Sequence, residues 1–508
     1  MSEPAWTSTH PHLPDAGFDG GSMDCGNGLL LEIRRHLNAL DTGGLLEIRS
    51  TEPSVAGDLP SWSRLTGNML VSRTGTPNSA SYIVCKGAFN SDRRRSGTVR
   101  STVAARLPGP RLAVPSGSPV PLNLPPLAVT GVGSWPRPAW MLHLLAAHLE
   151  DRLPPGVFAA AAADATRLAV ADQIACGVDL VTDGEQSRDT YAGFVGSRLG
   201  ACRLIPLEDL AAHVEHPEEF RRELSALDVP PGAHHPVALG RLVRDRELVV
   251  PDLRSARAST AIPVKIALPG PYLLARTLWL DCLLERHYKD RETLADDVCT
   301  VLRDEISHLL AEGAAIVQLD EPVLTEVVHG APAARRSFMC GALSERREPA
   351  QELAFALDLW RRVTDGLPRD HLALHVCRGN WSADESVALS GPYTPLLETL
   401  SQSPFGTLFL EMATPRAGAL EDLTGLPSWM RLGIGLVNQK LDQPESVPML
   451  LGRIRRAAQL FGPHRILLNP DCGFATFATC PLASREAAMR RMQILTECAQ
   501  TVRRELGI

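Results

Sequence analysis

Four residues in the second half of the chain have the types and the spacing of a metal site. His375 and Cys377 are separated by one residue in an apolar run, and Glu411 and Cys472 follow further along the chain. On a β-strand, residues two apart point to the same face. A His-x-Cys pair alone is more often structural. With a second thiol and a carboxylate it becomes a donor set that suits zinc, which takes imidazole and thiolate ligands in a tetrahedron.

Short apolar runs with β character alternate with helical stretches from residue 124 onward. Eight strand–helix units over about 385 residues predict a (β/α)8 TIM barrel, with a doubly wound open sheet as the alternative. No G-x-G-x-x-G follows the first run and no G-x-x-x-x-G-K-[ST] occurs, so a nucleotide-binding loop has no support. The predicted strands are 127–133, 178–184, 263–270, 314–320, 372–376, 407–413, 431–437 and 465–471.

Further candidate residues follow the predicted strands, at the end of a barrel where catalytic groups gather. Ser134 follows the first strand, Glu185 the second and Lys440 the seventh, and Asp320 ends the fourth. Each also has an ordinary structural interpretation. Ser134 could be a turn residue, Asp320 a helix cap and Lys440 a solvated side chain, and Glu185 could pair with Arg188.

The motifs that contain these residues occur in a family-specific order. VTGVGSWPRP, TDGEQSR, LPGPY and VQLDEP come first, and LHVCRGN, FLEMATPR, GIGLVNQK and LNPDCGFATF follow. Across residues 125–508 the chain resembles the C-terminal catalytic barrel of cobalamin-independent methionine synthase, the MetE family. The resemblance implies the barrel type shared with uroporphyrinogen decarboxylase. It covers one barrel only, as in the shorter members of the family.

The resemblance implies a zinc-dependent S-methyltransferase that converts homocysteine to methionine. His375, Cys377 and Cys472 would hold Zn²⁺, and Glu411 would be the fourth ligand or one displaced by the substrate. Zinc would lower the pKa of the homocysteine thiol, so that a zinc thiolate attacks the methyl group.

The resemblance also assigns the amino-acid end of the substrate and the methyl donor. Ser134 would bind the carboxylate of homocysteine, and Glu185 and Asp320 would bind its ammonium group. In the family, an Asp-x-His after the seventh strand serves the donor site and proton transfer. This chain has Asn438-Gln439-Lys440 there, so Lys440 becomes the candidate proton donor. The donor is then a 5-methyltetrahydrofolate, as in 5-methyltetrahydropteroyltriglutamate–homocysteine S-methyltransferase, or a methylated corrinoid protein.

The N-terminal part divides into three segments by composition. Residues 1–22 predict a flexible tail, 23–88 a small two-layer α+β domain, and 89–123 a linker rich in Pro, Gly and Arg; the barrel follows at 124–508. Residues 23–88 resemble the sulfur-carrier family of TusA/SirA type, but the Cys-Pro-x-Pro of that family is absent. Cys25 precedes the predicted first helix, whose N-terminus would lower its thiol pKa. It is therefore a candidate sulfur carrier for a sulfur-relay partner.

Composition excludes several classes of protein. The 508 residues are 44% hydrophobic and 21% charged, which rules out full-length disorder. The net charge of −7 argues against a nucleic-acid binder. No apolar run reaches a membrane span, and the N-terminus lacks the basic and apolar regions of a signal peptide. We therefore expect a cytoplasmic protein without membrane or nucleic-acid partners.

Two functional alternatives remain open at this stage. One keeps the barrel and the zinc but makes the protein a thiol alkyltransferase, or a sulfur-transfer enzyme fed by the TusA-like domain. The other is a non-catalytic protein that binds zinc or sulfur.

Overall fold

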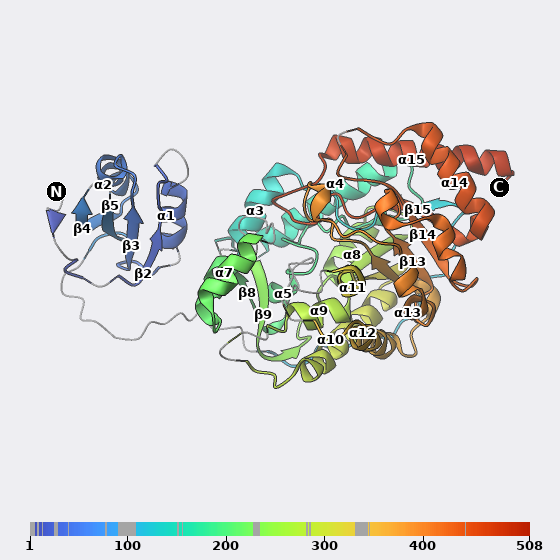
Figure 1. Cartoon of the computed structure of the whole chain (residues 1–508), viewed down its shortest axis with the longest axis horizontal. Helices are drawn as coiled ribbons and strands as arrows, with labels where there is room; N and C mark the ends of the chain where they lie inside the picture. The colour runs from blue at the N-terminus through green and yellow to red at the C-terminus, as the bar shows by residue number, and fades with distance from the viewer. Residues whose placement is uncertain are drawn as a thin grey trace. The chain divides into compact units, whose positions relative to one another are not determined.

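The computed structural model divides the chain into two units, residues 1–104 and 105–508 (Figure 1). Each unit is described by itself below. The described residues are 6–7, 10–12, 14–24, 29–38, 40–76, 79–89, 108–149, 152–154, 156–226, 234–280, 283, 286–330, 344, 346–441 and 443–508.

Eight parallel strands form the centre of the second unit. Their order in the sheet is β6-β15-β14-β13-β12-β11-β10-β7, and a parallel bridge between Thr130 and Leu180 joins the two end strands. The sheet is therefore a closed barrel, and the doubly wound alternative is wrong. The strands are β6 (Ala128–Val129), β7 (Val181–Thr182), β10 (Val264–Pro269), β11 (Ile316–Asp320), β12 (Leu372–Val376), β13 (Thr407–Leu410), β14 (Arg431–Val437) and β15 (Ile466–Pro470).

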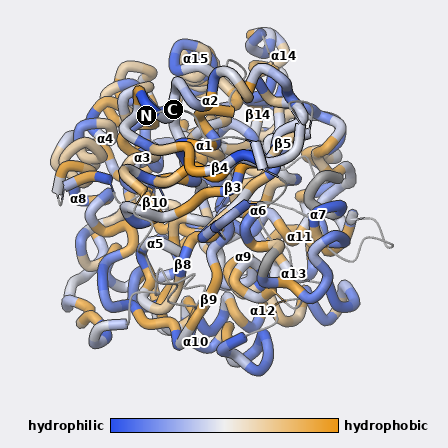
Figure 2. Tube along the Cα trace, turned by 90° about the vertical axis from the view of Figure 1, so that its left-hand side faces the viewer, coloured by the Kyte–Doolittle hydropathy of each residue, from blue (hydrophilic) through white to orange (hydrophobic). Residues whose placement is uncertain are grey.

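Helices connect successive strands and cover the outside of the barrel. They carry both hydrophilic and hydrophobic stretches (Figure 2), because one face packs on the strands and the other faces water. The helices are α3 (Ala139–Leu149), α4 (Val157–Ala175), α8 (Val250–Arg257), α9 (Pro271–Thr277), α10 (Arg291–Ala311), α11 (Val323–His329), α12 (Pro349–Thr364), α13 (Leu397–Ser401), α14 (Val447–Phe461) and α15 (Arg485–Leu506). Short 3₁₀ turns lie at Arg369–His371, Glu385–Val387, Thr394–Leu396, Pro415–Ala417, Leu420–Gly425 and Pro463–Arg465.

An insertion between β7 and β10 has no counterpart in the sequence prediction. Its antiparallel hairpin pairs β8 (Gly200–Pro206) with β9 (His234–Val243). The helices beside it are α5 (Val195–Arg198), α6 (Leu207–Leu210) and α7 (Pro217–Ala226), with a 3₁₀ turn at Ala211–His213. Among the helices of the described residues, none is long and apolar enough to cross a membrane.

The N-terminal unit is a five-stranded mixed sheet with two helices. The strand order is β1-β4-β5-β3-β2. Both helices bury apolar residues in one cluster with the sheet, while a separate small cluster covers the other face. This agrees with the predicted two-layer α+β arrangement. The elements are β1 (Trp6–Thr7), β2 (Ala16–Asp19), α1 (Leu29–Asn38), β3 (Leu45–Ser50), α2 (Val55–Leu65), β4 (Met69–Thr76) and β5 (Ser79–Cys85).

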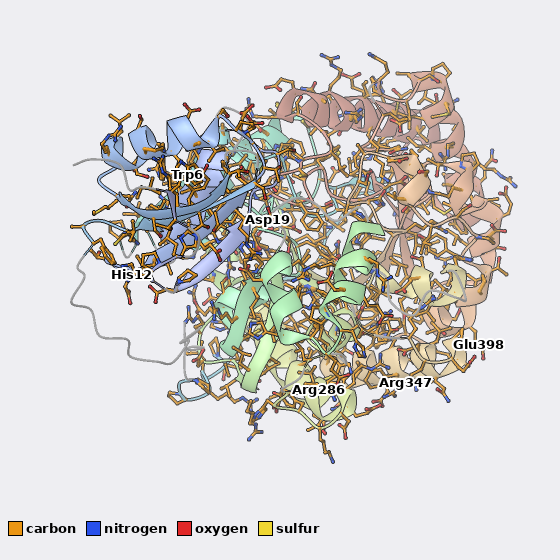
Figure 3. The ribbon with its side chains drawn as sticks, turned by 60° about the vertical axis from the view of Figure 1, so that its left-hand side comes forward. Trp6, His12, Asp19, Arg286, Arg347 and Glu398 are labelled. Carbon is orange, nitrogen blue, oxygen red and sulfur yellow. The ribbon has the colours of Figure 1, made fainter. Side chains whose placement is uncertain are left out.

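The prediction that residues 1–22 form a flexible tail is wrong for the residues described there. Trp6 and Asp19, which Figure 3 labels, belong to the two edge strands of the sheet. β1 pairs in parallel with β4, and β2 pairs in parallel with β3. Between the edge strands, the imidazole of His10 hydrogen-bonds the hydroxyls of Ser72 (2.7 Å) and Ser81 (3.0 Å). The sequence did not show this because β1 has two residues and β2 has four, too few for a recognisable alternation.

Deletion of residues 1–20 tests this correction. The deletion removes both edge strands and the partly buried Trp6 and Phe18, whose burial contributes about 1.5–3 kcal/mol each when complete. Since about 1 kcal/mol shifts the midpoint of a small domain by about 4–8 °C, we expect the N-terminal unit to melt more than about 10 °C earlier. Hydrogen exchange of peptides from residues 45–85, followed at rising temperature in the parent and in the deletion variant, measures this. Unchanged protection would restore the tail interpretation.

The predicted linker boundary at residue 123 is also wrong. Residues 90–107 lie outside the described residues, but residues 108–123 make polar contacts with the barrel unit. Gly109 donates its N–H to Asp245 (2.7 Å), and the guanidinium of Arg111 pairs with Asp304 (2.6 Å). This segment therefore belongs to the second unit. Arg111, which the sequence analysis placed in the linker, forms an ion pair there.

Candidate metal centre and active site

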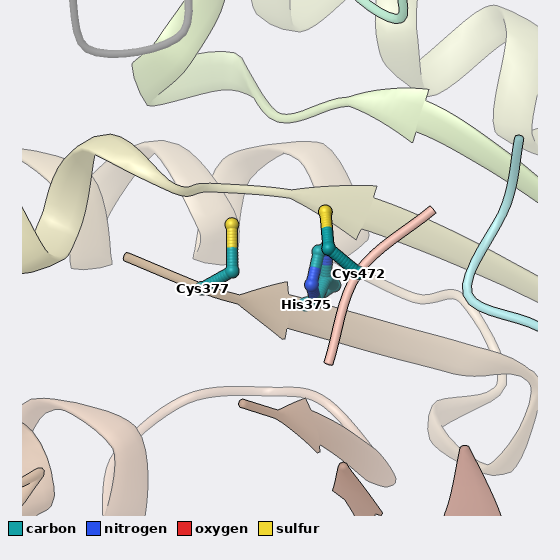
Figure 4. A group of neighbouring side chains, drawn as sticks. All are labelled: His375, Cys377 and Cys472. Atoms are coloured by element: carbon teal, nitrogen blue, oxygen red, sulfur yellow. The ribbon is translucent and has the colours of Figure 1, made fainter. Parts of the chain in front are cut away.

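The predicted metal ligands lie together at the carboxyl ends of the barrel strands. His375 and Cys377 come from the end of β12, and Cys472 follows β15 (Figure 4). All three are buried, and their ligand atoms lie within 4.8 Å of one another. In a tetrahedron with zinc–sulfur bonds of about 2.3 Å, ligand atoms lie about 3.5–4 Å apart. Small side-chain movements would therefore close this group around a metal ion.

Asp320 holds His375 in a defined orientation. Its Oδ1 accepts a hydrogen bond from Nδ1 of His375 at 3.0 Å, while Nε2 of His375 is enclosed and has no hydrogen-bond partner in the described part of the chain. Burial lowers the pKa of His375, but Asp320 and Cys377 outweigh burial and raise it to about 10. A carboxylate that orients a metal-binding imidazole in this way is common around zinc.

The structure does not bring Glu411 into the group of ligand atoms. One carboxylate oxygen accepts from the backbone N–H of Arg378 (2.8 Å) and the amide of Asn380 (2.9 Å). The other accepts from the guanidinium of Arg416 at 2.7 Å. Glu411 is therefore not among the residues whose ligand atoms meet here, and its role as the fourth ligand, or as one displaced by the substrate, stays a prediction. Catalytic zinc sites commonly use three protein ligands and one exchangeable position.

A pocket of about 370 Å³ opens over the three ligands. It brings Ser134, Glu185 and Asp320 next to them, so six of the predicted site residues meet in one place. The lining residues are Val132, Gly133, Ser134, Glu185, Tyr191, Asp320, Pro322, His375, Cys377, Asn380, Cys472, Gly473 and Thr476.

Ser134 joins the beginning and the end of the barrel. Its hydroxyl oxygen accepts from the N–H of Ala475 (3.2 Å), and its carbonyl accepts from the N–H of Phe474 (3.0 Å). Its hydroxyl hydrogen remains available to donate into the pocket. Gly473 packs against this hydroxyl, and a side chain at that position would collide with it. The loop after β15 therefore fixes Ser134 at the pocket wall.

Glu185 is a buried acid with an unusual backbone. Its φ of +54° is left-handed, which is uncommon for a residue with a side chain and occurs often at functional sites. Burial raises its pKa to about 7, and Arg188 opposes this while Asp183 adds to it. The guanidinium of Arg188 lies 3.0 Å from Asp183 and 3.7 Å from Glu185. The pairing of Glu185 with Arg188 is thus present, and it does not remove Glu185 from the pocket.

The comparisons with known proteins agree with this geometry. The family described as "Cobalamin-independent synthase, Catalytic domain" matches residues 127–497. The chain belongs to this family. It is 24% identical to the methionine synthase of Thermococcus kodakarensis over 391 residues, which covers 76% of this chain and 96% of that protein. The corresponding protein of Saccharolobus solfataricus is 24% identical over 388 residues, with 76% and 97% covered.

Solved structures support the fold. A B12-independent methionine synthase from Shewanella sp. W3-18-1, in complex with selenomethionine, has a TM-score of 0.56 and 22% identity. The match covers 75% of this chain and 99% of that one. A putative B12-independent methionine synthase from Listeria monocytogenes has a TM-score of 0.52 and 17% identity. The barrel prediction is confirmed.

The family match confirms that the protein is an enzyme of the cobalamin-independent methionine synthase type, a methyltransferase of methionine biosynthesis. The match gives no support to the thiol-alkylating, sulfur-transferring or non-catalytic alternatives. It begins at residue 127, so the resemblance of the N-terminal unit to TusA/SirA proteins stays a prediction. Cys25, the candidate sulfur carrier, lies outside the described residues.

Lys440, like Glu411, is a predicted site residue that does not line the pocket. Its Nζ is enclosed and has no hydrogen-bond partner among the residues described. It lies near enough to Asp384 and Glu385 for their charges to interact. Asn438 contacts the same carboxylate, because its amide donates a hydrogen bond to Glu385 at 2.6 Å. The end of β14 therefore carries a small charged cluster.

Sequence reasoning missed Asn380, Thr476 and Tyr191, which line the pocket, and Arg416, which binds Glu411. The first three lie in loops after strands, where no spacing rule marks them. Arg416 had a signal, since it stands five residues after Glu411 in the same motif. An arginine so close to a proposed ligand carboxylate is a natural ion-pair partner for it.

Proposed function

We propose that this enzyme transfers a methyl group to the sulfur of homocysteine and releases methionine, with zinc held by His375, Cys377 and Cys472. The observation that carries the proposal is the position of the three soft ligands in a pocket that also contains Glu185 and Ser134. One end of such a pocket takes a thiol, and the other takes an amino acid's charged groups.

The ligands fit zinc by their chemistry. Two thiols and one imidazole form a soft set, and Nε2 of His375, which has no hydrogen-bond partner among the described residues, would bind the metal through its lone pair once the ring has lost its proton. When bound, zinc lowers the pKa of an incoming thiol so that it is a nucleophile at neutral pH. The buried setting keeps water away from that nucleophile.

The amino-acid end of homocysteine is bound by residues of the first, second and fourth strands. Glu185 and Asp320 supply carboxylates for the ammonium group. Ser134 supplies a hydroxyl hydrogen for the carboxylate, since Ala475 already donates to its oxygen. These contacts would hold the amino-acid end of the substrate, so that its sulfur reaches the metal ligands.

Homocysteine binding is expected to depend on pH through Glu185. Burial raises the pKa of Glu185 to about 7, so the neutral acid predominates below this pH and the carboxylate above it. Only the carboxylate attracts ammonium. We expect the KM for homocysteine to rise about tenfold for each pH unit below 7. In the Glu185→Gln variant, this dependence of KM on pH should disappear. The zinc-loaded enzyme is assayed from pH 5.5 to 8.5, and the same pH profile in the variant would contradict the assignment.

Lys440 is proposed to protonate the departing donor. A folate donor leaves through a nitrogen that must gain a proton, whereas a methylated corrinoid leaves as cob(I)alamin without one. General acids contribute about 10²–10⁴-fold to rate. We expect Lys440→Met to lower kcat by about 10²-fold or more with 5-methyltetrahydrofolate and to leave methylcobalamin turnover nearly unchanged. Equal losses with both donors would show a structural role.

The proposed reaction is tested with the purified full-length protein, homocysteine and one of two donors carrying a deuterated methyl group. The donors are 5-methyltetrahydropteroyltriglutamate and methylcobalamin. We expect deuterated methionine with at least one donor, and loss of product after chelation of the metal. A zinc-loaded protein that forms no methionine with either donor would overturn the proposal.

A further inference from the structure

Lys265 is a buried cation beneath the pocket that the reaction described above does not use. It lies on β10 and is fully buried. Its Nζ donates to the carbonyl of Val132 at 2.6 Å and to Oε1 of Gln318. The ammonium group also lies 4.3 Å from the centre of the Phe409 ring. These partners hold it in one place inside the barrel.

A chain of hydrogen bonds leads from Lys265 to the metal ligand His375. Gln318 and Asp320 are two residues apart on β11, so they lie on the same face of the sheet. The amide of Gln318 donates to Oδ1 of Asp320 at 2.7 Å, and the same oxygen accepts from Nδ1 of His375 at 3.0 Å. Asp320 and His375 are register partners on neighbouring strands. All four side chains are buried.

The chain has a fixed direction because an ammonium group can only donate hydrogen bonds. Lys265 therefore requires the oxygen of Gln318, which turns the Gln318 nitrogen toward Asp320. The carboxylate of Asp320 can only accept, so Nδ1 of His375 must carry the hydrogen. When the ring loses its second proton to a metal ion, its lone pair is then on Nε2, the atom that has no hydrogen-bond partner in the described residues. That nitrogen is the one available to a metal ion.

We propose that Lys265 is a positioning residue of the metal centre: through Gln318 and Asp320 it fixes the ring of His375 in the state that presents Nε2 to the metal. Burial lowers the pKa of Lys265 to about 7, and the nearby carboxylates of Asp320 and Glu185 oppose this shift. The inference deepens the proposed function and rests on zinc being bound at His375, Cys377 and Cys472.

The test measures zinc affinity in the full chain by competition with a chromophoric chelator. The variants are Lys265→Met, Gln318→Leu and the double substitution. Loss of a partner that orients a ligand costs about 10–100-fold in metal affinity, and we expect this loss in each single variant. Because both substitutions break the same chain, the double variant is expected to bind zinc no more weakly than the weaker single variant.

A spectroscopic readout distinguishes positioning from general destabilisation. In ¹⁵N-histidine NMR of the zinc-loaded parent, the imidazole whose signals change on zinc removal is expected to carry hydrogen on Nδ1 and to bind through Nε2. In Lys265→Met we expect a mixture of states for that ring. Thr407→Val is the control, since it removes the hydrogen bond that the buried Thr407 hydroxyl at the start of β13 accepts from Arg431 (3.2 Å). It should leave zinc affinity and these signals unchanged.

The outcomes separate the two claims. A parent without zinc would overturn the proposed function. A parent with zinc, together with Lys265→Met and Gln318→Leu variants of parental affinity and parental NMR signals, would overturn only the positioning role. Additive losses in the double variant would overturn it as well. If Lys265→Met does not fold, Gln318→Leu keeps the buried charge and tests the same chain.

Discussion

Replacing Cys472 by serine is expected to remove most of the zinc and nearly all of the methyl transfer. Serine keeps the size of the side chain but exchanges a soft sulfur for a hydroxyl that stays protonated at neutral pH. Structural zinc sites bind the metal with about 10–16 kcal/mol in total. One of three protein ligands therefore accounts for several kcal/mol. At about 1.4 kcal/mol per factor of ten, we expect zinc affinity to fall about 10²–10³-fold or more. Zinc per chain and kcat are measured together.

The control is Cys498→Ser on α15, another buried cysteine, which lies outside the pocket wall. It should keep about one zinc per chain and parental activity, although it loses some stability. If Cys472→Ser kept its zinc and its turnover, the metal centre would have to lie elsewhere, and the assignment of His375 and Cys377 as ligands would fall with it.

Replacing Asp320 should have the second largest effect, because the structure gives this carboxylate two tasks. Its Oδ1 orients His375 (3.0 Å), and its position in the pocket wall offers a negative charge to the substrate ammonium. We expect Asp320→Ala to weaken zinc binding about 10–100-fold and to raise the KM for homocysteine. Asp320→Asn keeps an oxygen that can accept from Nδ1. We therefore expect a small loss of zinc affinity and a larger rise in the KM for homocysteine.

Zinc affinity is measured without homocysteine, so that the two tasks are observed separately. Asp304→Asn serves as the matched control, since Asp304 is also buried and charge-paired, with Arg111 at 2.6 Å, but is not part of the pocket. Parental zinc affinity in Asp320→Ala would show that His375 does not depend on this hydrogen bond. The interpretation of the whole Lys265–Gln318–Asp320 chain would then have to change.

The barrel was predictable because parallel strands covered by helices are buried on both faces. Such strands are continuous apolar runs of β character, and each of the eight runs contains one observed strand. Their carboxyl ends then collect the polar residues, which is why Ser134, Glu185 and Asp320 could be placed beside the metal ligands from the sequence. At these positions the family motifs and the predicted strand ends indicated the same residues.

Other features depend on contacts that the sequence does not encode locally. β1 has two residues and pairs with β4, more than sixty positions later, so residues 1–22 resemble a tail. The partners of Glu411 include Arg378, 33 residues earlier. Lys265 and Gln318 are 53 residues apart and belong to different strands. Each of these pairings requires the folded barrel or sheet before it can be recognised.

The central claim is that this pocket brings a thiol substrate to a metal held by His375, Cys377 and Cys472. X-ray absorption at the zinc edge, with and without homocysteine, tests it most directly. The account predicts two sulfur neighbours at about 2.3 Å in the substrate-free enzyme and three when homocysteine is present. A protein that takes up no zinc, or one whose sulfur count does not change when homocysteine is added, would contradict the account.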